Sequence, residues 1–223
     1  MALNTGLMAF WADFEDADIS SVREWHNCQH MSERVNIPGF RLGRRYRGFG
    51  NAATFLMYYE TTSPNVLAGK DYQSALNNPT EWTKRTLTLY RNPVRAIFAL
   101  VEEAGVQPSE PAFYLATLRF NLERDRDGIL DEYRRRVLPE LAKRPDIIRV
   151  RLWENQQHIT GITTQESRIY GGGPSQQQYV LFVEAITRPE PFTPDNLPGL
   201  SKAGAIAHKD TIPETGWLDF ALR

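Results

Sequence analysis

Apolar runs of β-strand length recur along the chain and alternate with stretches of helical periodicity. In the first half, TGLMAFWADF is the first such run, and the acidic and serine residues after it offer N-caps for a helix that Pro38-Gly39 would stop. The predicted elements of this half are strand 5–14, helix 19–35, strands 40–49 and 54–62, a helical stretch that includes 79–90, and strand 92–104. Their order is βαββαβ.

The same order begins again after a segment that contains two prolines and a glycine. The second set of predicted elements is strand 112–120, helix 125–144, strands 146–155 and 178–186, a short helix around 193–203, and a last strand in 203–210 or 216–222. A period of about 105 residues indicates internal duplication. The prediction is a first repeat at 1–104, a linker at 105–110 and a second repeat at 111–223.

Laying the two halves over each other supports the duplication. When PGFRLGRRY is placed on PDIIRVRLW, Arg44 falls on Arg151 and Tyr46 on Trp153. The second half has a longer loop between its middle strands, at 160–178, which is too polar and too rich in glycine for a core and is predicted to be a mobile, exposed flap or rim.

A lone βαββαβ unit covers one face of its sheet with two helices and leaves the other face bare. Two such units can bury their bare faces on each other. The fold class predicted here is therefore α+β, with two ferredoxin-like repeats that form a pseudo-dimeric α+β barrel within one chain around a shared cavity.

The stretch WHNCQHMSERVNIPGFRLGRRY at 25–46 has an aromatic residue, a histidine, an acidic residue, Pro-Gly-Phe and then a strand with basic and aromatic residues. In this order it resembles the helix-to-strand signature of EthD-like and related proteins of the dimeric α+β barrel superfamily, and the second half keeps only its outline. The resemblance implies a barrel of two ferredoxin-like units, usually from two chains and here from one. That superfamily includes small monooxygenases, isomerases, haem enzymes and proteins of unknown role, so the fold alone does not select a function.

One stripe of the first long helix begins apolar and becomes polar. Its members are Ile19, Val22, His26, Gln29, His30 and Glu33. The corresponding stripe of the second helix is apolar throughout, with Val137 or Leu138 opposite His30. Because an imidazole titrates near neutral pH, His30 is a candidate general base or hydrogen-bond donor, with His26 beside it; the alternative is a structural histidine that ties helix to strand.

Further candidates surround these histidines. Trp25 and Glu33 are candidate ligand contacts on the same helix. His26 and His30, with Glu33 beyond them, could also form a metal face. No ligand of matching character is evident elsewhere to complete it, and we predict no metal site.

Arg44 and Arg151 share a strand face with Tyr46 and Trp153, respectively, and an arginine beside an aromatic ring can hold a planar anionic or oxygenated ligand. Two structural alternatives stay open. Charged residues protect sheet edges, and glutamates of the neighbouring strands, Glu60 and Glu184, could pair with these arginines across the hairpins.

The amino-acid composition limits the kinds of molecule that the protein is expected to bind. The 26 Lys and Arg residues nearly balance 27 Asp and Glu residues, which gives no global field to attract nucleic acid or an anionic membrane. Cys28 is the only cysteine, so no intrachain disulfide forms, and the N-terminal residues lack a basic segment followed by an apolar run. We expect a cytoplasmic protein that binds a small molecule and that could form a homodimer.

No GxGxxG after a strand, P-loop, nucleophile elbow or CxxC pair is present, so we predict no nucleotide cofactor; haem is an alternative that only the resemblance raises. The leading interpretation is a cofactor-independent monooxygenase-like enzyme or isomerase that acts on a small hydrophobic or aromatic oxygenated molecule in the barrel cavity. His30 would be the base, and Arg44 and Tyr46 polar anchors. The alternative is a non-catalytic ligand-binding or stress-associated protein.

Overall fold

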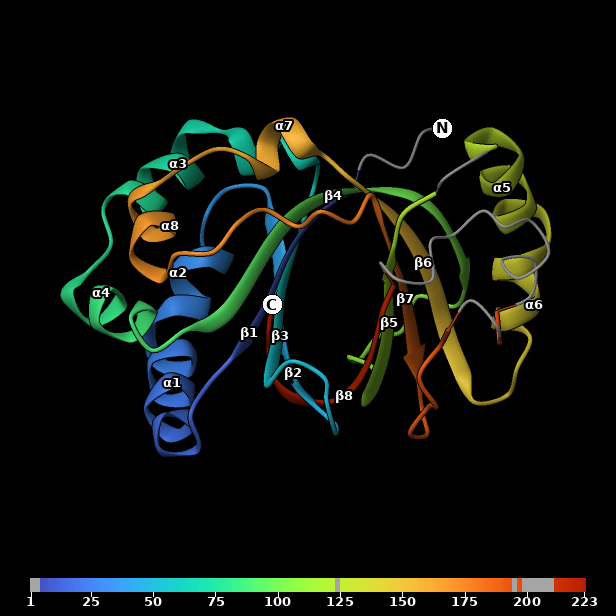
Figure 1. The fold of residues 1–223 in the computed structure, drawn as a ribbon, viewed down its shortest axis with the longest axis horizontal. Helices are drawn as coiled ribbons and strands as arrows, with labels where there is room; N and C mark the ends of the chain where they lie inside the picture. The colour runs from blue at the N-terminus through green and yellow to red at the C-terminus, as the bar shows by residue number, and fades with distance from the viewer. Residues whose placement is uncertain (1–4, 123–124, 194–195, 198–210) are drawn as a thin grey trace.

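Eight strands close into one antiparallel barrel in the computed structural model, which describes residues 5–122, 125–193, 196–197 and 211–223. Around the barrel the order is β1-β3-β2-β8-β5-β7-β6-β4 (Figure 1). The strands are β1 (Gly6–Asp13), β2 (Phe40–Gly48), β3 (Phe55–Thr61), β4 (Arg91–Gly105), β5 (Tyr114–Phe120), β6 (Ile147–Asn155), β7 (Tyr179–Ala185) and β8 (Ile212–Leu222). The predicted α+β barrel within one chain is confirmed.

Each half contributes four neighbouring strands in the same relative order, β4-β1-β3-β2 and β8-β5-β7-β6. The halves join where β2 pairs with β8 and where β4 pairs with β6. The duplication itself stays a prediction. The last strand lies at the second of its two predicted positions, while the other position, 203–210, and most of the predicted helix at 193–203 lie outside the described residues.

Helices cover the outside of the barrel on two sides (Figure 1). They are α1 (Ile19–Trp25), α2 (Met31–Val35), α3 (Lys70–Asn77), α4 (Glu81–Leu87), α5 (Arg126–Glu132), α6 (Leu138–Ala142), α7 (Gln157–Thr160) and α8 (Gln165–Tyr170). In both halves the predicted long helix contains a π-helical turn, at His26–His30 between α1 and α2 and at Tyr133–Val137 between α5 and α6. Turns of this kind are rare in helices and frequent at functional sites. No helix of the described ranges is both long and apolar enough to cross a membrane.

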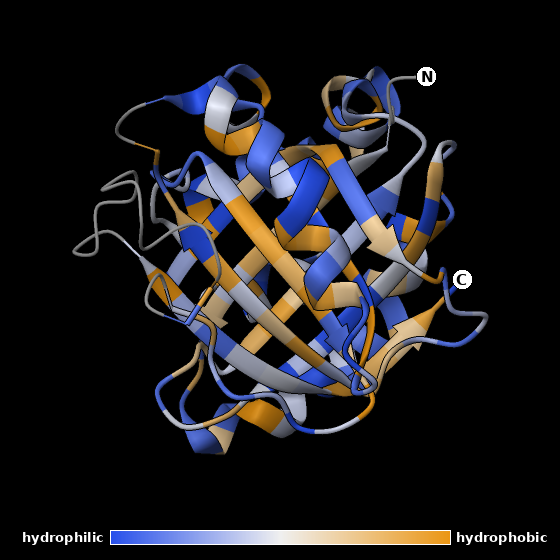
Figure 2. Cartoon of the chain, turned by 90° about the vertical axis from the view of Figure 1, so that its right-hand side faces the viewer, coloured by the Kyte–Doolittle hydropathy of each residue, from blue (hydrophilic) through white to orange (hydrophobic). Residues whose placement is uncertain are grey.

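Alternation of side chains along the strands divides the buried residues into three apolar clusters, one inside the barrel and one beneath each helix layer. Residues such as Trp11, Tyr58 and Phe182 fill the interior. Figure 2 looks onto the α5–α6 side and shows apolar and polar residues interspersed along strands and helices. Side chains thus fill most of the interior.

The stretch 160–178, predicted to be a flap or rim, is in part built into the helix layer. This stretch contains α8, which contacts α3 and α4 and joins the helix layer over the first half of the sheet (Figure 1). Thr164 caps α8 by accepting a hydrogen bond from the Ser167 amide, in a reciprocal capping box. Glu166 is 4% exposed, because its carboxylate pairs with Arg34 of α2. An ion pair with a distant helix thus allows one charged side chain of this polar segment to be buried.

Candidate functional site

The helix that carries His26 and His30 lies directly on the outer face of β2 and β3. Gly43 of β2 permits this approach, since a Cβ there would lie 2.8 Å from the Tyr59 ring and 2.9 Å from Cγ of Met31. The π-helical turn directs His26 and His30 toward the sheet, with their ring centroids 5.8 Å apart. His26 is 1% exposed and His30 is 8% exposed.

His26 lies in a hydrogen-bonded chain that ends at Tyr59. Arg45 donates from Nη1 to Nδ1 of His26 over 2.9 Å, and because an arginine only donates, Nδ1 carries no proton. Burial, followed by repulsion from Arg45 and Arg34, lowers the pKa of His26 well below 6.5, so the ring is neutral at pH 7 with its proton on Nε2. Nε2 donates to the Tyr59 hydroxyl over 3.1 Å. Tyr59 is therefore left with its own proton to donate to a further acceptor.

The far end of this chain is anchored in β8 and in the π-helical turn. Asp219 accepts from Nε of Arg45 over 2.6 Å, and Asn27 accepts from its Nη2 over 2.8 Å. Burial raises the pKa of Tyr59, which keeps its hydroxyl protonated. The chain Asp219, Arg45, His26 and Tyr59 thus fixes the orientation of one hydroxyl donor.

His30 has no such partner. Its Nδ1 is buried without a hydrogen bond, and no described residue bonds to its Nε2. The ring of Trp25 lies against the imidazole with centroids 4.2 Å apart, while the Trp25 indole N–H is used in a 3.2 Å bond to Thr83. Burial, with smaller contributions from Arg34 and His26, lowers the pKa of His30 well below 6.5. His30 is therefore a neutral imidazole, able to accept a proton.

These groups line a hollow of about 450 Å³ between the helix layer and the outer face of the first half of the sheet, which we call the outer hollow. Its apolar lining is Met8, Phe10, Met57, Leu76 and Leu87. Its polar lining includes His26, His30, Arg34, Tyr59, Arg95 and Glu166. With both histidines neutral, two arginines and one glutamate leave a net positive charge.

Two of the predicted contacts on this helix do not reach the outer hollow directly. Trp25 supports His30 from behind. Glu33 is half-buried and accepts a 2.8 Å hydrogen bond from Gln29. The stripe continues with buried Arg34 and not, as predicted, with Glu33, which does not line the outer hollow.

The other four predicted residues lie inside the barrel, on the opposite face of the sheet. The predicted site residues are therefore divided between the two faces of the sheet, because side chains alternate along β2 and the helix covers only its outer face. Arg44 pairs with Glu184 at 2.8 Å and Arg151 with Glu60 at 2.7 Å. The predicted pairing of arginines with these glutamates is confirmed, with the difference that each pair joins the two halves.

Tyr46 and Trp153, the aromatic neighbours of these arginines, are also held by contacts inside the barrel. The Tyr46 hydroxyl donates to the carbonyl of Ala112 over 2.7 Å, and Trp153 packs in the interior apolar cluster. Both side chains are almost fully buried. The four residues consolidate the barrel, and Tyr46 also lines a small hollow in its interior.

Sequence reasoning missed the remaining polar residues of the outer hollow. Arg34 continues the stripe of His26 and His30 at helical spacing, so periodicity could have found it. Tyr59 carried no signal beyond a strand position that equally suits a core. Glu166 could not be found locally, because its burial depends on Arg34, 132 residues away.

Metal and haem were tested against these residues. Within the described ranges, no three side chains of the His, Cys, Asp and Glu types gather where they could bind a metal ion. The surroundings of His30 do not fit a haem, because the ring of Trp25 lies against the imidazole with centroids 4.2 Å apart. A porphyrin also needs a broad apolar slot, whereas charged Arg34, Arg95 and Glu166 line this hollow.

No protein-family model and no curated protein matches the sequence. Solved structures match over nearly the whole chain at low identity. An anthrone oxidase-like protein has a TM-score of 0.62 at 8% identity and covers 100% of this chain and 95% of its own. A monooxygenase-like protein from Lactobacillus acidophilus NCFM has 0.59 at 9%, with 98% and 95% covered. A chlorite dismutase from Candidatus Nitrospira defluvii has 0.53 at 9%, with 97% and 92% covered. At such identities the likeness concerns the fold.

Proposed function

Since the chain has the fold of the dimeric α+β barrel superfamily, with monooxygenase-like neighbours, we propose that it is a cofactor-independent oxygenase whose active site is the outer hollow. The substrate class is a small aromatic molecule with a phenolic hydroxyl or a methylene activated by a ring carbonyl. The observation that carries the proposal is His30, a buried neutral base without a partner at the edge of a positively charged hollow.

Binding and orientation follow from the two sides of the outer hollow. The apolar side accepts the aromatic ring, and the polar side places the substrate oxygen near the Tyr59 hydroxyl, whose proton is directed outward by His26. Arg34 and Arg95 favour negative charge in the bound molecule. They therefore stabilise a phenolate or enolate more than its neutral parent, which is the differential stabilisation that catalysis requires.

Proton transfer to His30 starts the reaction. For a ring methylene next to a carbonyl, His30 takes one C–H proton, and the electron pair delocalises onto the oxygen bonded by Tyr59. Dioxygen, the co-substrate, forms a C–O bond at the same carbon, and the peroxide takes the proton back from His30. Breaking the O–O bond and the second C–H bond releases water, so that R₂CH₂ + O₂ gives R₂C=O + H₂O.

The test is oxygen uptake by the purified protein with anthrone and with one-ring and two-ring phenols. We expect uptake by the wild type and a loss of about 100-fold or more in His30→Gln, since general base catalysis contributes roughly 10²–10⁴. His158→Gln is the matched control, because His158 is exposed on α7. It should keep full activity.

Two results would contradict the proposal. Equal rates for His30→Gln and wild type would remove His30 as the base. Tight binding of these probes without any oxygen uptake would favour the alternative, a non-catalytic ligand-binding protein.

The internal repeat belongs to the same proposal. We infer that units 1–104 and 111–223 arose by duplication. Three features support this: the equal strand order, the π-helical turns at matching places, and the reciprocal Arg44–Glu184 and Arg151–Glu60 pairs. In this view only the first copy kept a polar helix face.

A further inference from the structure

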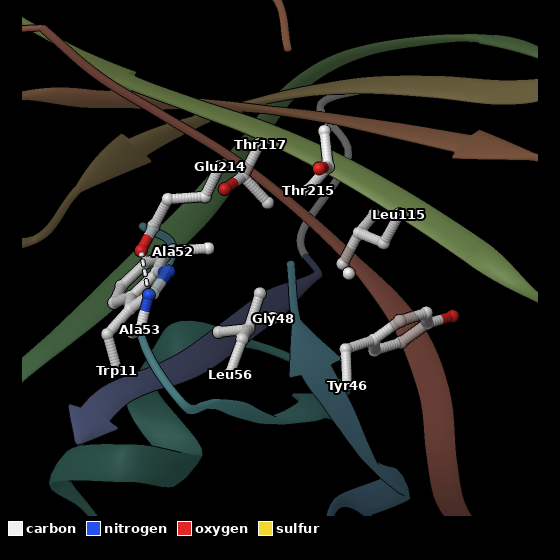
Figure 3. Close-up of a pocket in the computed structure, with 11 residues that line it drawn as sticks. Trp11, Tyr46, Gly48, Ala52, Ala53, Leu56, Leu115, Thr117, Glu214 and Thr215 are labelled. Carbon is white, nitrogen blue, oxygen red and sulfur yellow. Dashed lines mark hydrogen bonds between the residues drawn. The ribbon is translucent and has the colours of Figure 1, made fainter. Parts of the chain in front are cut away.

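A second hollow lies inside the barrel, at the end where the β2–β3 hairpin meets the start of β8 (Figure 3). It has an empty volume of about 250 Å³, and we call it the inner hollow. The sheet separates it from the outer hollow: on β1, Met8 and Phe10 face the outer hollow, whereas Trp11 faces the inner one. The two hollows are therefore distinct sites.

Two buried polar groups of the inner hollow have no hydrogen-bond partner. They are the indole N–H of Trp11 and the hydroxyl of Thr117, each on a side chain that is 2% exposed. In Figure 3 both lie on the same side of the hollow, and Leu56, Leu115 and Tyr46 form the apolar remainder. Buried polar groups are almost always bonded, so this pair indicates a place for a polar atom of a bound molecule.

The charges next to this pair are already neutralised. Glu214 accepts from the Ala53 amide over 3.0 Å with one carboxylate oxygen and from Arg119 over 3.2 Å with the other. The guanidinium of Arg119 lies over the Trp11 ring, 4.2 Å from its centroid. Both carboxylate oxygens are engaged. Arg119 is paired with Glu214 through Nη2, while its Nε and Nη1 are buried without a hydrogen-bond partner. Because Arg119 is not among the lining residues, the lining itself offers no free charge to a ligand.

We propose that the inner hollow is a second binding site, for a small neutral molecule with one apolar ring or chain and one oxygen, such as a phenol, alcohol or ketone. The ligand oxygen accepts from the Trp11 indole and bonds the Thr117 hydroxyl. Its apolar part packs on Leu56 and Leu115. This site is independent of catalysis in the outer hollow.

The proposal is tested by titrating the ¹⁵N-labelled protein with phenol and, separately, with toluene, while the indole N–H resonances are recorded. Trp11 reports the inner hollow, and Trp25, which packs on His30, reports the outer hollow. Assignment comes from Trp11→Phe and Trp25→Phe. We expect a saturable shift of the Trp11 resonance with phenol, and an affinity about five- to tenfold lower for toluene, which lacks the oxygen.

Thr117→Val keeps the side-chain shape and removes the hydroxyl, and it should reduce the phenol affinity seen at Trp11 by a similar factor while the Trp25 response is unchanged. If this variant does not fold, the comparison of phenol with toluene on the wild type decides alone. A Trp11 resonance that no probe shifts means a site filled by water only and overturns the proposal. A shift confined to Trp25 also overturns it and leaves the proposed function standing.

Discussion

At the scale of single residues, the most heavily charged point of the interior is Glu184. Its carboxylate is fully buried and lies within 2.8 Å of Arg44 and 2.6 Å of Arg149, with Arg151 at 3.5 Å. Burial alone would raise the pKa of Glu184, but Arg151, Arg149 and Arg44 together lower it to about 2. Three cations from both halves therefore lie against this one anion, and Arg151 has a second partner in Glu60.

Glu184→Gln should destabilise the protein by about 3–5 kcal/mol at pH 7, because it leaves buried arginines uncompensated. The folded pKa of about 2 lies below the usual 4.5, so the stabilisation by the carboxylate is complete above pH 4.5 and is lost as pH falls toward 2. Urea unfolding at pH 7, 4 and 3 should show that the difference in the free energy of unfolding between wild type and variant becomes smaller as the pH falls. A gap independent of pH would contradict this account, and Glu132→Gln, at an exposed ion pair, is the control.

At the scale of elements, α8 is the segment that closes the outer hollow. Its only buried charge is Glu166, and the partner of that charge is Arg34 of α2. The two side chains are 6% and 4% exposed, so water screens the pair little. The pair therefore couples a segment of the second half to the helix of the proposed active site.

Glu166→Gln should destabilise the protein by about 3 kcal/mol or more, since Arg34 then stays charged and buried without an anion. Amide hydrogen exchange should show that the loss of protection is concentrated in residues 165–170 and 31–35. Glu81→Gln, which breaks the exposed pair with Lys84, should change stability by less than about 1 kcal/mol. Equal effects of the two substitutions would contradict a closing role for α8.

Local sequence patterns were sufficient for most strands and for the long helices, because apolar runs and helical periodicity report which face of an element is buried. For the same reason, these patterns placed His26 and His30 together on one face of their helix. They failed for α8, since its polar residues become buried only through a contact with a residue far away in the chain. They also failed to show that Arg44 and His30 lie on opposite sides of the sheet. Which face of a strand becomes the barrel interior is decided only when the whole sheet closes.

At the scale of the whole molecule, one barrel carries two unequal outer faces. Beneath α5 and α6 the space is filled by an apolar cluster that includes Val137 and Leu138. Beneath α1 and α2 the corresponding layer contains imidazoles, arginines and a hollow. The two outer faces of one barrel therefore differ, and the polar hollow lies on the first.

The central claim is that ligand binds between the helix layer and the first half of the sheet. The most direct test is a crystal structure of the protein grown with 1-naphthol, an aromatic phenol, in the absence of oxygen. The account predicts ring density in the outer hollow, with the phenol oxygen at hydrogen-bond distance from the Tyr59 hydroxyl and close to His30. Density only inside the barrel, or only on the surface, would contradict it.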